Sequence, residues 1–369
     1  MVIAGLGDTG VLTATKLSRH CDVVGISTKA EFVTGQELGT RLARPEVWER
    51  DNRFAFESLR KLDGIRVVHG AATALDLDAR QVHVRLADGR DAVEPYDVLV
   101  VATGVTNGFW RRPEVQSRAD VSQELESAHL RLAGAESVAV IGGGASAVNA
   151  AAHLASSRPG RRTDLYFPGD AALPHHHRKV WAQVAERLLA LGVGLHPGHR
   201  ADVPAGFDCD TITSEPVTFA TGQPATAADA VVWAIGRTAP NTGWLPDELL
   251  DSAGFVRVTP TLQAEDRPEV FAVGDVAATD PLRCSARNRA DGLLATNIRA
   301  HLRGRPLGAF RPTRVRWGSV LGIQPDGIEV FLASGSVIRF RLWTVERILL
   351  PWYLYRGVYG GIRRRSGRS

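Results

Sequence analysis

The apolar and polar positions of the chain change period repeatedly, from short apolar runs typical of buried strands to longer amphipathic runs typical of helices. Predicted strands of the main body are residues 1–4, 22–26, 65–69, 74–77, 82–85, 98–102, 137–141, 164–167, 230–234 and 270–273. Predicted helical segments are a run ending at residue 18, a polar segment ending near 60, a run starting at 145, 180–191 and 286–302. Strands that alternate with helices predict parallel sheets, so we expect an α/β fold.

Turn residues divide the C-terminal region into a small β-meander. Pro325-Asp326-Gly327 and Ser334-Gly335 separate three predicted strands, residues 315–322, 328–332 and 336–341. An aromatic, arginine-rich tail follows, in which Pro351 is expected to break or kink a helix. The predicted apolar face of that helix consists of Val345, Ile348, Leu349, Trp352 and Tyr359, with Arg356 among them.

Two glycine-rich loops each follow an apolar strand and open a helix. The first is Gly5-x-Gly7-x-x-Gly10 and the second is Gly142-x-Gly144-x-x-Ala147. In such loops the first glycine makes a tight turn, the second lets the backbone approach a pyrophosphate, and the third position lets helix pack on strand. Either loop alone is also compatible with a tight turn that binds nothing. Both together predict two dinucleotides, and a flavin with a nicotinamide is the economical pair.

Three further strands end in small residues that let a bulky ligand approach the backbone. These ends are Ala102-Thr103-Gly104, Ala234-Ile235-Gly236 and Gly274-Asp275. With the two loops, with Tyr96-Asp97 and with Pro240-Asn241, their order resembles the FAD-dependent pyridine nucleotide oxidoreductases, the two-dinucleotide-binding flavoproteins. Within that superfamily the chain resembles type II NADH dehydrogenases and the apoptosis-inducing-factor-like ferroptosis-suppressor reductases.

The resemblance implies two Rossmann-like domains, one inserted in the other, and a small C-terminal β/helical region. The FAD-binding domain would span 1–110 and 238–305, the NAD(P)H-binding domain 111–237, and the C-terminal region 306–369. The expected cofactor-binding residues are Gly5, Gly7, Asp8, Thr9, Gly10, Ser27, Arg41, Ala72, Ala102, Thr103, Gly104, Gly142, Gly144, Ala145, Ser146, Asn149, Ala234, Ile235, Gly236, Gly274 and Asp275. No catalytic side chain is expected, because the cofactors carry the hydride chemistry.

Several positions depart from the family pattern. Ser27 and Phe167 stand where an acid would hold an adenosine ribose, so NADPH stays open beside NADH. Arg161, Arg162 and Arg178 are the candidates for a 2′-phosphate. Asn149 replaces a glutamate that often faces the nicotinamide, and Asp8 is expected to point outward or cap the helix, because an anion facing phosphate is costly.

The net charge of +4 comes from the tail, where residues 337–369 hold eight arginines and one acid. The body therefore gives no reason to expect nucleic-acid binding. Cys21, Cys209 and Cys284 form no C-x-x-C pair, which argues against a disulfide acceptor; Cys284 reads as an inert thiol or as a reactive one at a helix start. His175-His176-His177, with His196 and His199, reads as a solvated loop, and we expect no metal site.

The tail combines aromatic, aliphatic and arginine side chains, as segments at a membrane interface do. It fits a peripheral membrane contact, packing on its own domain, or a homodimer interface. We expect a cytoplasmic protein, peripheral on the inner face of the cell membrane if the tail binds lipid. The function expected is an FAD-dependent NAD(P)H dehydrogenase that passes electrons to a quinone-type acceptor. The alternatives are a nucleotide-binding regulatory or scaffold flavoprotein with little turnover, and a reductase of a soluble redox protein.

Overall fold

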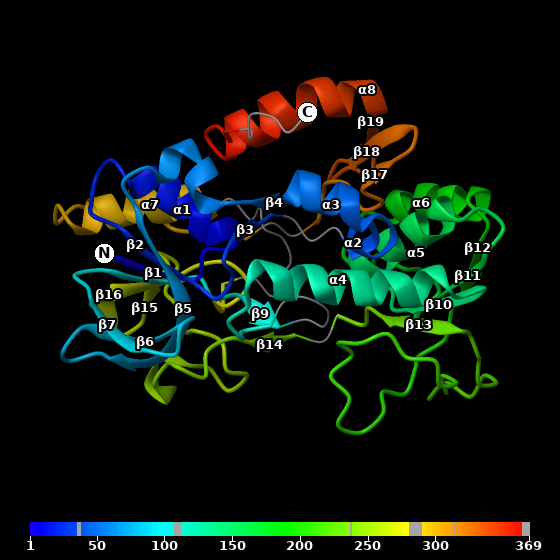
Figure 1. The fold of residues 1–369 in the computed structure, drawn as a ribbon, viewed down its shortest axis with the longest axis horizontal. Helices are drawn as coiled ribbons and strands as arrows, with labels where there is room; N and C mark the ends of the chain where they lie inside the picture. The colour runs from blue at the N-terminus through cyan, green and yellow to red at the C-terminus, as the bar shows by residue number, and fades with distance from the viewer. Residues whose placement is uncertain (35–37, 107–111, 237, 280–289, 313–314, 364–369) are drawn as a thin grey trace.

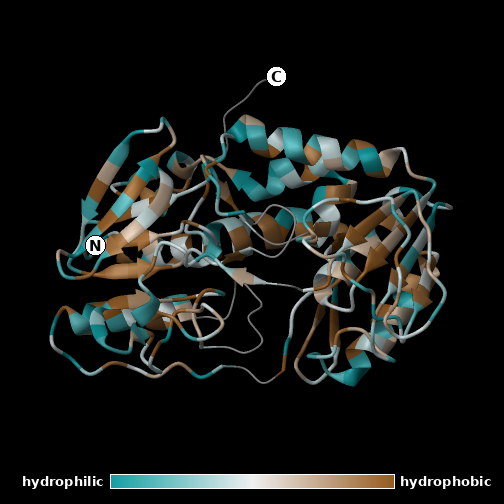
Figure 2. Cartoon of the chain, turned by 90° about the horizontal axis from the view of Figure 1, so that it is seen from below, coloured by the Kyte–Doolittle hydropathy of each residue, from teal (hydrophilic) through white to brown (hydrophobic). Residues whose placement is uncertain are grey.

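The computed structural model describes residues 1–34, 38–106, 112–236, 238–279, 290–312 and 315–363. The chain forms two α/β lobes side by side, and the C-terminal helix extends across the top of both (Figure 1). Hydrophobic residues colour the strands inside each lobe, whereas hydrophilic residues dominate the outer loops and turns (Figure 2). The predicted α/β class is confirmed.

The first lobe is built on a sheet of order β15-β16-β8-β1-β2-β5-β6-β7. The five strands from β16 to β5 are parallel, and α1 (Asp8–Leu17) packs against α7 (Ala290–His301) over them. The strands are β1 (Val2–Ala4), β2 (Val24–Ser27), β5 (Arg66–Asp76), β6 (Gln81–Leu86), β7 (Asp91–Pro95), β8 (Leu99–Val101), β15 (Gln263–Ala264) and β16 (Arg267–Ala272). The two strands predicted at 65–69 and 74–77 are one strand, β5, because a bulge at Ala72 lets pairing with β6 continue.

The second lobe has a four-stranded parallel sheet of order β12-β11-β10-β13. Its strands are β10 (Ser137–Ile141), β11 (Arg162–Tyr166), β12 (Val193–His196) and β13 (Ala230–Trp233). Its helices are α4 (Arg118–Ala133), α5 (Ala145–Ser157) and α6 (Arg178–Ala190). This order is that of a dinucleotide-binding half, whose ligands lie at the carboxyl ends of the strands where the order reverses.

Two chain crossings join the lobes. β9 (Val105–Thr106) pairs antiparallel with β14 (Ala239–Pro240). Beside them, the Thr103 hydroxyl donates to the Asn241 backbone carbonyl at 2.8 Å, and the Asn241 side-chain NH2 donates to the Thr103 carbonyl at 3.1 Å. The two crossings therefore form one hydrogen-bonded ribbon. η3 (Asp247–Leu249) follows it in the first lobe.

The polar segment expected to be helical up to residue 60 is broken into short elements. They are β3 (Phe32–Val33), α2 (Leu38–Ala43), α3 (Pro45–Asn52), β4 (Arg53–Phe54), η1 (Phe56–Ser58) and η2 (Arg60–Leu62). Pro45 starts α3 and ends the helix before it, since proline disfavours helical geometry in the residue it follows. The segment lies against α4 and supplies one wall of the space between the lobes.

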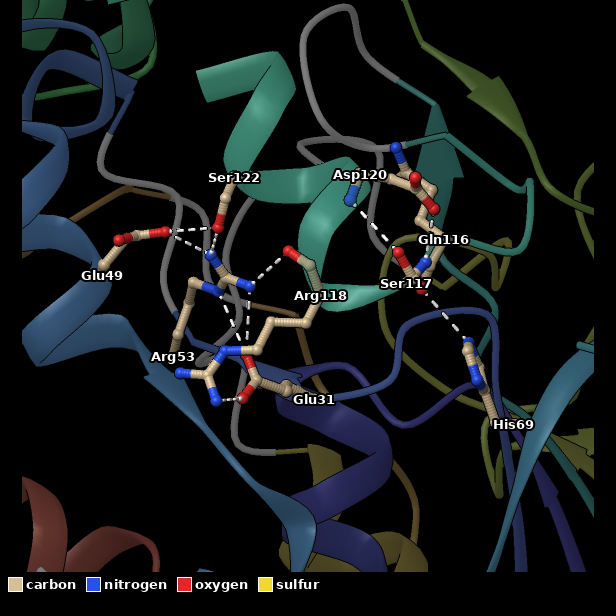
Figure 3. A network of polar contacts seen from close by, with 9 residues as sticks. All are labelled: Glu31, Glu49, Arg53, His69, Gln116, Ser117, Arg118, Asp120 and Ser122. Carbon is tan, nitrogen blue, oxygen red and sulfur yellow. Dashed lines mark hydrogen bonds and ion pairs between the residues drawn. The ribbon is translucent and has the colours of Figure 1, made fainter. Parts of the chain in front are cut away.

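A buried ion-pair network fixes this segment to α4 (Figure 3). Arg53, whose side chain is 3% exposed, binds Glu31 at 3.1 Å and also pairs with Glu49. Its guanidinium donates to the Ser122 hydroxyl at 2.7 Å and to the Arg118 carbonyl at 3.0 Å, both on α4. One arginine thus ties β4, α3 and α4 together.

The C-terminal region begins with a meander of β17 (Ile323–Gln324), β18 (Gly327–Phe331) and β19 (Val337–Arg341). Both predicted hairpin turns are present. The strand predicted at 315–322 is wrong: in its described part, only Gly318 pairs, with Phe331. Gly318 and Gly322 adopt positive φ angles of 124° and 71°, which interrupt an extended ladder.

The chain continues from α8 (Leu342–Thr344) into η4 (Val345–Val358), a π-helix. Pro351 lies inside η4, so the helix does not break there, and the kink expected as the alternative stays a prediction. At the end of η4 the Tyr359 amide donates to the Leu354 carbonyl at 3.1 Å, five residues back, as in a π-helix. No helix in the described ranges has the length and hydropathy needed to cross a membrane.

η4 packs on the first lobe through part of its surface. Val345 and Tyr359 are both 2% exposed, and the Tyr355 ring meets Phe54 edge-on at 5.4 Å. Ile348 and Trp352, predicted to share that face, are 44% and 59% exposed, because π-helical winding places residues around the axis differently from an α-helix. Arg363 pairs with Asp63, whereas Arg364, Arg365 and Arg368 lie outside the described residues.

Candidate functional site

The two glycine loops have the same internal packing. A Cβ on Gly5 would lie 2.3 Å from the Ala102 carbonyl oxygen, and a Cβ on Gly142 would lie 2.2 Å from that of Ala234. A Cβ on Gly10 would lie 1.9 Å from the Gly5 carbonyl oxygen. Gly5 and Gly142 also adopt positive φ angles of 101° and 138°. Only glycine meets these demands at little cost. These three glycines serve the fold of the loops.

The middle glycine of each loop has a different environment. No protein atom lies within 4 Å of a Cβ built on Gly7 or Gly144. Gly7 is the residue before α1, and Gly144 is the residue before α5, so the unpaired amides of each helix start face the same open space. This arrangement suits a phosphate group at each helix.

One cavity of about 2230 Å³ runs between the lobes and connects both loops. Every predicted cofactor-binding residue lines it except Gly10 and Gly142, which instead pack closely against the backbone carbonyls of Gly5 and Ala234. The strand ends at Ala102, Ala234 and Gly274 therefore reach the same space as the loops. The sequence placed these residues in separate motifs, and the fold brings them together.

The first loop and the Gly-Asp motif face one another. A Cβ on Gly274 would lie 3.2 Å from the Thr9 hydroxyl oxygen, and Gly274 has a positive φ of 84°. Asp275 follows and lines the cavity beside Thr103 and Gly104. The helix start expected next to Asp275 falls within residues 280–289, outside the described part of the chain, as does Cys284.

Ser27, at the end of β2, is committed to a local turn. Its hydroxyl donates to the Lys29 carbonyl at 2.8 Å and accepts from the Lys29 amide at 3.1 Å. It retains one lone pair for a ribose hydroxyl. The Lys29 ammonium, whose pKa burial lowers to about 8, binds the carbonyls of Arg112 at 3.2 Å and Glu114 at 3.0 Å.

Two other predicted residues of the first lobe have specific neighbours. The Arg41 guanidinium stacks over the Trp48 ring, 4.0 Å from its centroid. Asp8 is the first residue of α1, and its carboxylate accepts a hydrogen bond from the Tyr359 hydroxyl. The carboxylate is therefore held by the C-terminal segment at the edge of the phosphate loop. Ala72 reaches the cavity from the β5 bulge.

Asn149 links the two lobes. Its side-chain oxygen accepts from the Gly39 amide of α2 at 2.7 Å, and a Cβ on Gly39 would lie 2.4 Å from the Asn149 carbonyl. One turn further along α5, the His153 ring meets Arg44 at 3.0 Å and Thr40 at 3.4 Å. Burial lowers the pKa of His153 to about 3, aided by the charge of Arg44. The neutral His153 ring and the Asn149 side chain therefore hold α5 against α2.

The candidates for a 2′-phosphate are not at the cavity. Buried Arg161 donates to the carbonyls of Leu132 and Leu154 at 2.8 and 2.7 Å. Arg162 pairs with Asp164 at 3.1 Å, and Arg178 starts α6. None of the three lines the cavity. Arg161 and Arg162 lie at the amino end of β11, opposite to its carboxyl end. Phe167 does follow β11, where its ring packs edge-on against Trp181.

The cavity has linings that sequence patterns did not indicate. Arg200 comes from the loop after β12, a strand that the hydrophobic pattern did not reveal. An apolar wall comes from the meander and η4, and its side chains are Trp317, Val320, Ile323, Ile328, Val330, Ile338, Phe340, Leu342, Val345, Leu349, Leu350, Tyr353 and Leu354. Some of these residues lie on strands and others on helices, so no single hydrophobic period in the sequence marks them as one surface.

The histidines are spread over several contacts. His177 caps α6 by accepting from the Lys179 amide, and His196 binds Asp164 at 2.9 Å while stacking on Tyr166. Among the described residues no three His, Cys, Asp or Glu side chains gather as metal ligands. Cys209 is buried, and burial raises the pKa of the half-buried Cys21.

A family model described as pyridine nucleotide-disulphide oxidoreductase matches residues 1–298, which include both loops and all three strand-end motifs. The chain belongs to this family. The resemblance inferred from the motifs is confirmed, and the fold is that of the two-dinucleotide-binding flavoproteins. Proteins of this family use FAD and NAD(P)H, as predicted. The open cradles at Gly7 and Gly144 fit the two pyrophosphates.

The chain is 27% identical over 346 residues to the type II NADH:quinone oxidoreductase Ndh of Mycobacterium tuberculosis, which covers 82% of this chain and 73% of that protein. It is 24% identical over 335 residues to human ferroptosis suppressor protein 1, covering 89% and 87%. Its fold superposes on the sulfide:quinone oxidoreductase of Aquifex aeolicus with a TM-score of 0.71 at 18% identity, covering 99% and 92%. The chain is an oxidoreductase by family.

Proposed function

We propose that this chain is an FAD-dependent NAD(P)H dehydrogenase that passes electrons to a quinone-type acceptor. The observation that carries the proposal is the single cavity lined by both phosphate loops and by an apolar wall. An FAD held in such a cavity would supply the hydride chemistry between a nicotinamide and a second substrate, and the residues of the cavity would hold and orient the three groups. The domain layout inferred from the sequence, with FAD on the first lobe and NAD(P)H on the second, is part of this proposal.

The proposed roles of the residues follow from their places. Gly5 to Thr9 hold the flavin pyrophosphate, and Asp275 holds its polyol. Gly144 to Ser146 hold the nicotinamide pyrophosphate, while Ala102 to Gly104 and Ala234 to Gly236 give the ring systems close backbone approach. Asn149 acts mainly as a positioning residue, since its side-chain oxygen binds Gly39. No side chain is required to move a proton in the first half-reaction.

The quinone proposal rests on the apolar wall and on relatives named as quinone reductases. Besides Ndh, the demethylphylloquinone reductase NdbB of Synechocystis is 26% identical over 385 residues. Val330, Ile338 and Phe340 of the meander face the cavity, as does Leu349 of η4. A planar apolar acceptor gains from leaving water for such a surface.

A substitution in the wall tests the acceptor. Ile338 is 44% exposed, so Ile338→Glu is expected to fold normally and to raise the KM for a short-chain quinone. Reduction of a hydrophilic dye by the same variant should not change. Val93→Glu is the matched control, because Val93 is 45% exposed on β7 and does not line the cavity. Equal kinetics with quinone for both variants would contradict the quinone assignment.

We also propose a peripheral membrane contact through the outer side of α8 and η4. Trp343 and Trp352 are 64% and 59% exposed there and do not line the cavity, and Arg356 lies 5.1 Å over the Trp352 ring. Interfacial aromatics beside arginine suit an anionic lipid surface. Sedimentation with phosphatidylglycerol vesicles should carry down the wild type and leave Trp343→Ser/Trp352→Ser in solution. A dimer that dissociates in the double variant, without vesicle binding, would assign the face to a homodimer instead.

A further inference from the structure

The second nucleotide site has a cationic end where a ribose-binding acid is expected. Among described residues 137–236 and 238–240, the cavity lining includes Arg200 and no aspartate or glutamate. The acids that do line the cavity, such as Asp8 and Asp275, come from the first lobe, from α4 or from η4. A ribose 2′-hydroxyl needs an acceptor, whereas a 2′-phosphate needs donors and positive charge.

Strand register brings Arg200 to the end of β11. β11 and β12 are parallel, with Tyr166 opposite His196, so the loops that follow them lie side by side. Two hydrogen bonds join those loops: the His199 amide donates to the Phe167 carbonyl at 2.9 Å, and the Gly198 amide donates to the Gly169 carbonyl at 3.1 Å. Arg200 is the next residue, and it shares the cavity lining with Pro168 and Gly169.

The backbone of Arg200 is held while its side chain is available. The Arg200 amide donates to the Thr221 hydroxyl at 3.0 Å, and its carbonyl accepts from the Ala220 amide at 2.9 Å. No carboxylate of the described residues pairs with its guanidinium. Asp170, the acid of the neighbouring loop, is exposed and does not line the cavity. The charge presented to a nucleotide here is therefore positive.

We propose that Arg200 recognises the 2′-phosphate of an adenosine and makes NADPH the preferred hydride donor. The proposal rests on the function proposed above and names the substrate of its first half-reaction. A guanidinium binds a phosphate dianion through two parallel N–H···O bonds, which a ribose hydroxyl cannot match. The position after β11 supplies no acceptor for a 2′-hydroxyl, because the residue there is Phe167 and its ring is buried against Trp181.

Binding of adenosine fragments tests the inference without relying on turnover. In calorimetric titrations, 2′,5′-ADP should bind the wild-type holoprotein about 10- to 100-fold more tightly than 5′-AMP. Arg200→Ala should remove the difference by weakening only 2′,5′-ADP, and Arg200→Lys should restore part of it. Arg162→Ala is the matched control, because Arg162 lies on β11 outside the cavity, and it should behave as wild type.

Reduction of the flavin separates this inference from the proposed function. NADPH should reduce the bound flavin at lower concentration than NADH, and Arg200→Ala should reverse or abolish that order. Equal binding of the two fragments, failure of 2′,5′-ADP to bind, or an unchanged preference in Arg200→Ala would overturn the inference even if NADH reduces the flavin. A flavin that neither nucleotide reduces, in a protein that still prefers 2′,5′-ADP, would instead overturn the dehydrogenase proposal.

Discussion

The hydroxyl of Tyr359 donates a hydrogen bond to the carboxylate of Asp8, which joins the end of η4 to the first residue of α1. The two residues are 351 positions apart. Tyr359 is 2% exposed, and its ring lies edge-on to Phe32 at 5.1 Å. The C-terminal helix is thereby attached to the phosphate loop proposed to hold FAD, and an acid inside that loop gains a structural partner.

Removing this hydroxyl should loosen both the helix and the loop. Tyr359→Phe is expected to lower the free energy of unfolding by about 1–3 kcal/mol, the usual cost of losing a hydrogen bond to a carboxylate. FAD should also bind more weakly. Urea titration and flavin fluorescence measure the two effects. Tyr353→Phe should change neither, because Tyr353 is 57% exposed and its hydroxyl makes no hydrogen bond to the described residues. An equal loss in both variants would argue against the Asp8 contact.

The middle glycines should separate the two nucleotide sites. Because a Cβ at Gly7 or Gly144 meets no protein atom, both alanine variants should keep near wild-type stability. Gly7→Ala is expected to weaken FAD binding by about tenfold or more, and Gly144→Ala to weaken NAD(P)H binding similarly, since each methyl would occupy the phosphate position. Titrations of each nucleotide measure this. Loss of both nucleotides in either variant would contradict two separate sites.

Gly142→Ala is the complementary change within the same loop. Its Cβ would lie 2.2 Å from the Ala234 carbonyl oxygen, at a φ of 138°. We expect a loss of about 2 kcal/mol or more in unfolding free energy, from strain and displacement of the β13 end. Thermal unfolding compares it with Gly144→Ala. Equal melting temperatures for the two variants would show that the close approach is not maintained in solution.

His153 should make stability depend on pH. Its pKa is about 3 in the fold and 6.5 when unfolded, so below pH 6.5 the unfolded chain binds a proton that the folded protein does not. The contribution is complete above pH 6.5 and is lost as pH falls toward 3, at up to about 1.4 kcal/mol per pH unit. His153→Gln should show a shallower decline over that range, while His176, whose burial lowers its pKa to about 4, keeps a residual slope. Parallel pH profiles would contradict the neutral buried ring.

Arg53 should matter far more than its neighbour Arg50. Arg53→Ala removes one of the two cations that lie 3.1 Å from the buried Glu31 carboxylate. Because Arg118 still pairs with Glu31, we expect a loss of about 3 kcal/mol, the low end for a broken buried ion pair. Arg50 is 64% exposed and pairs with Asp51, so Arg50→Ala should lower the free energy of unfolding by only about 0–1 kcal/mol. Denaturant midpoints decide between these values. Similar losses in the two variants would show that the network in Figure 3 contributes little.

The elements that local patterns specify strongly were predictable. The Gly5 and Gly142 loops, their strands and the helix from Ala145 follow from glycine spacing and hydrophobic period, and the structure places them as expected. β12 was missed because Val193–His196 has only four residues. Its two apolar side chains, Val193 and Leu195, stand on either side of a glycine and give no apolar run. Of the break or kink predicted at Pro351, the break is absent, because η4 continues through it as a π-helix, whose geometry the proline rule for α-helices does not describe.

The site could be predicted only as far as its residues belong to motifs. Arg200 depends on β12 register, and the wall at Ile338 depends on how the meander folds over the cavity. Arg161 and Arg162 were favoured by sequence proximity to β11, but they precede the strand's carboxyl end. Hydrogen bonds such as that between Asn149 and Gly39 join segments far apart in the sequence, so no local sequence pattern predicts them.

The central claim is that one cavity couples NAD(P)H, FAD and a quinone, and anaerobic rapid mixing tests it most directly. The FAD-loaded protein is mixed with NADPH or NADH and then with a short-chain quinone. The account predicts loss of the oxidised-flavin band near about 450 nm, faster with NADPH, and its return on adding quinone. Bound flavin that neither nucleotide reduces would contradict the account and leave a nucleotide-binding regulatory protein.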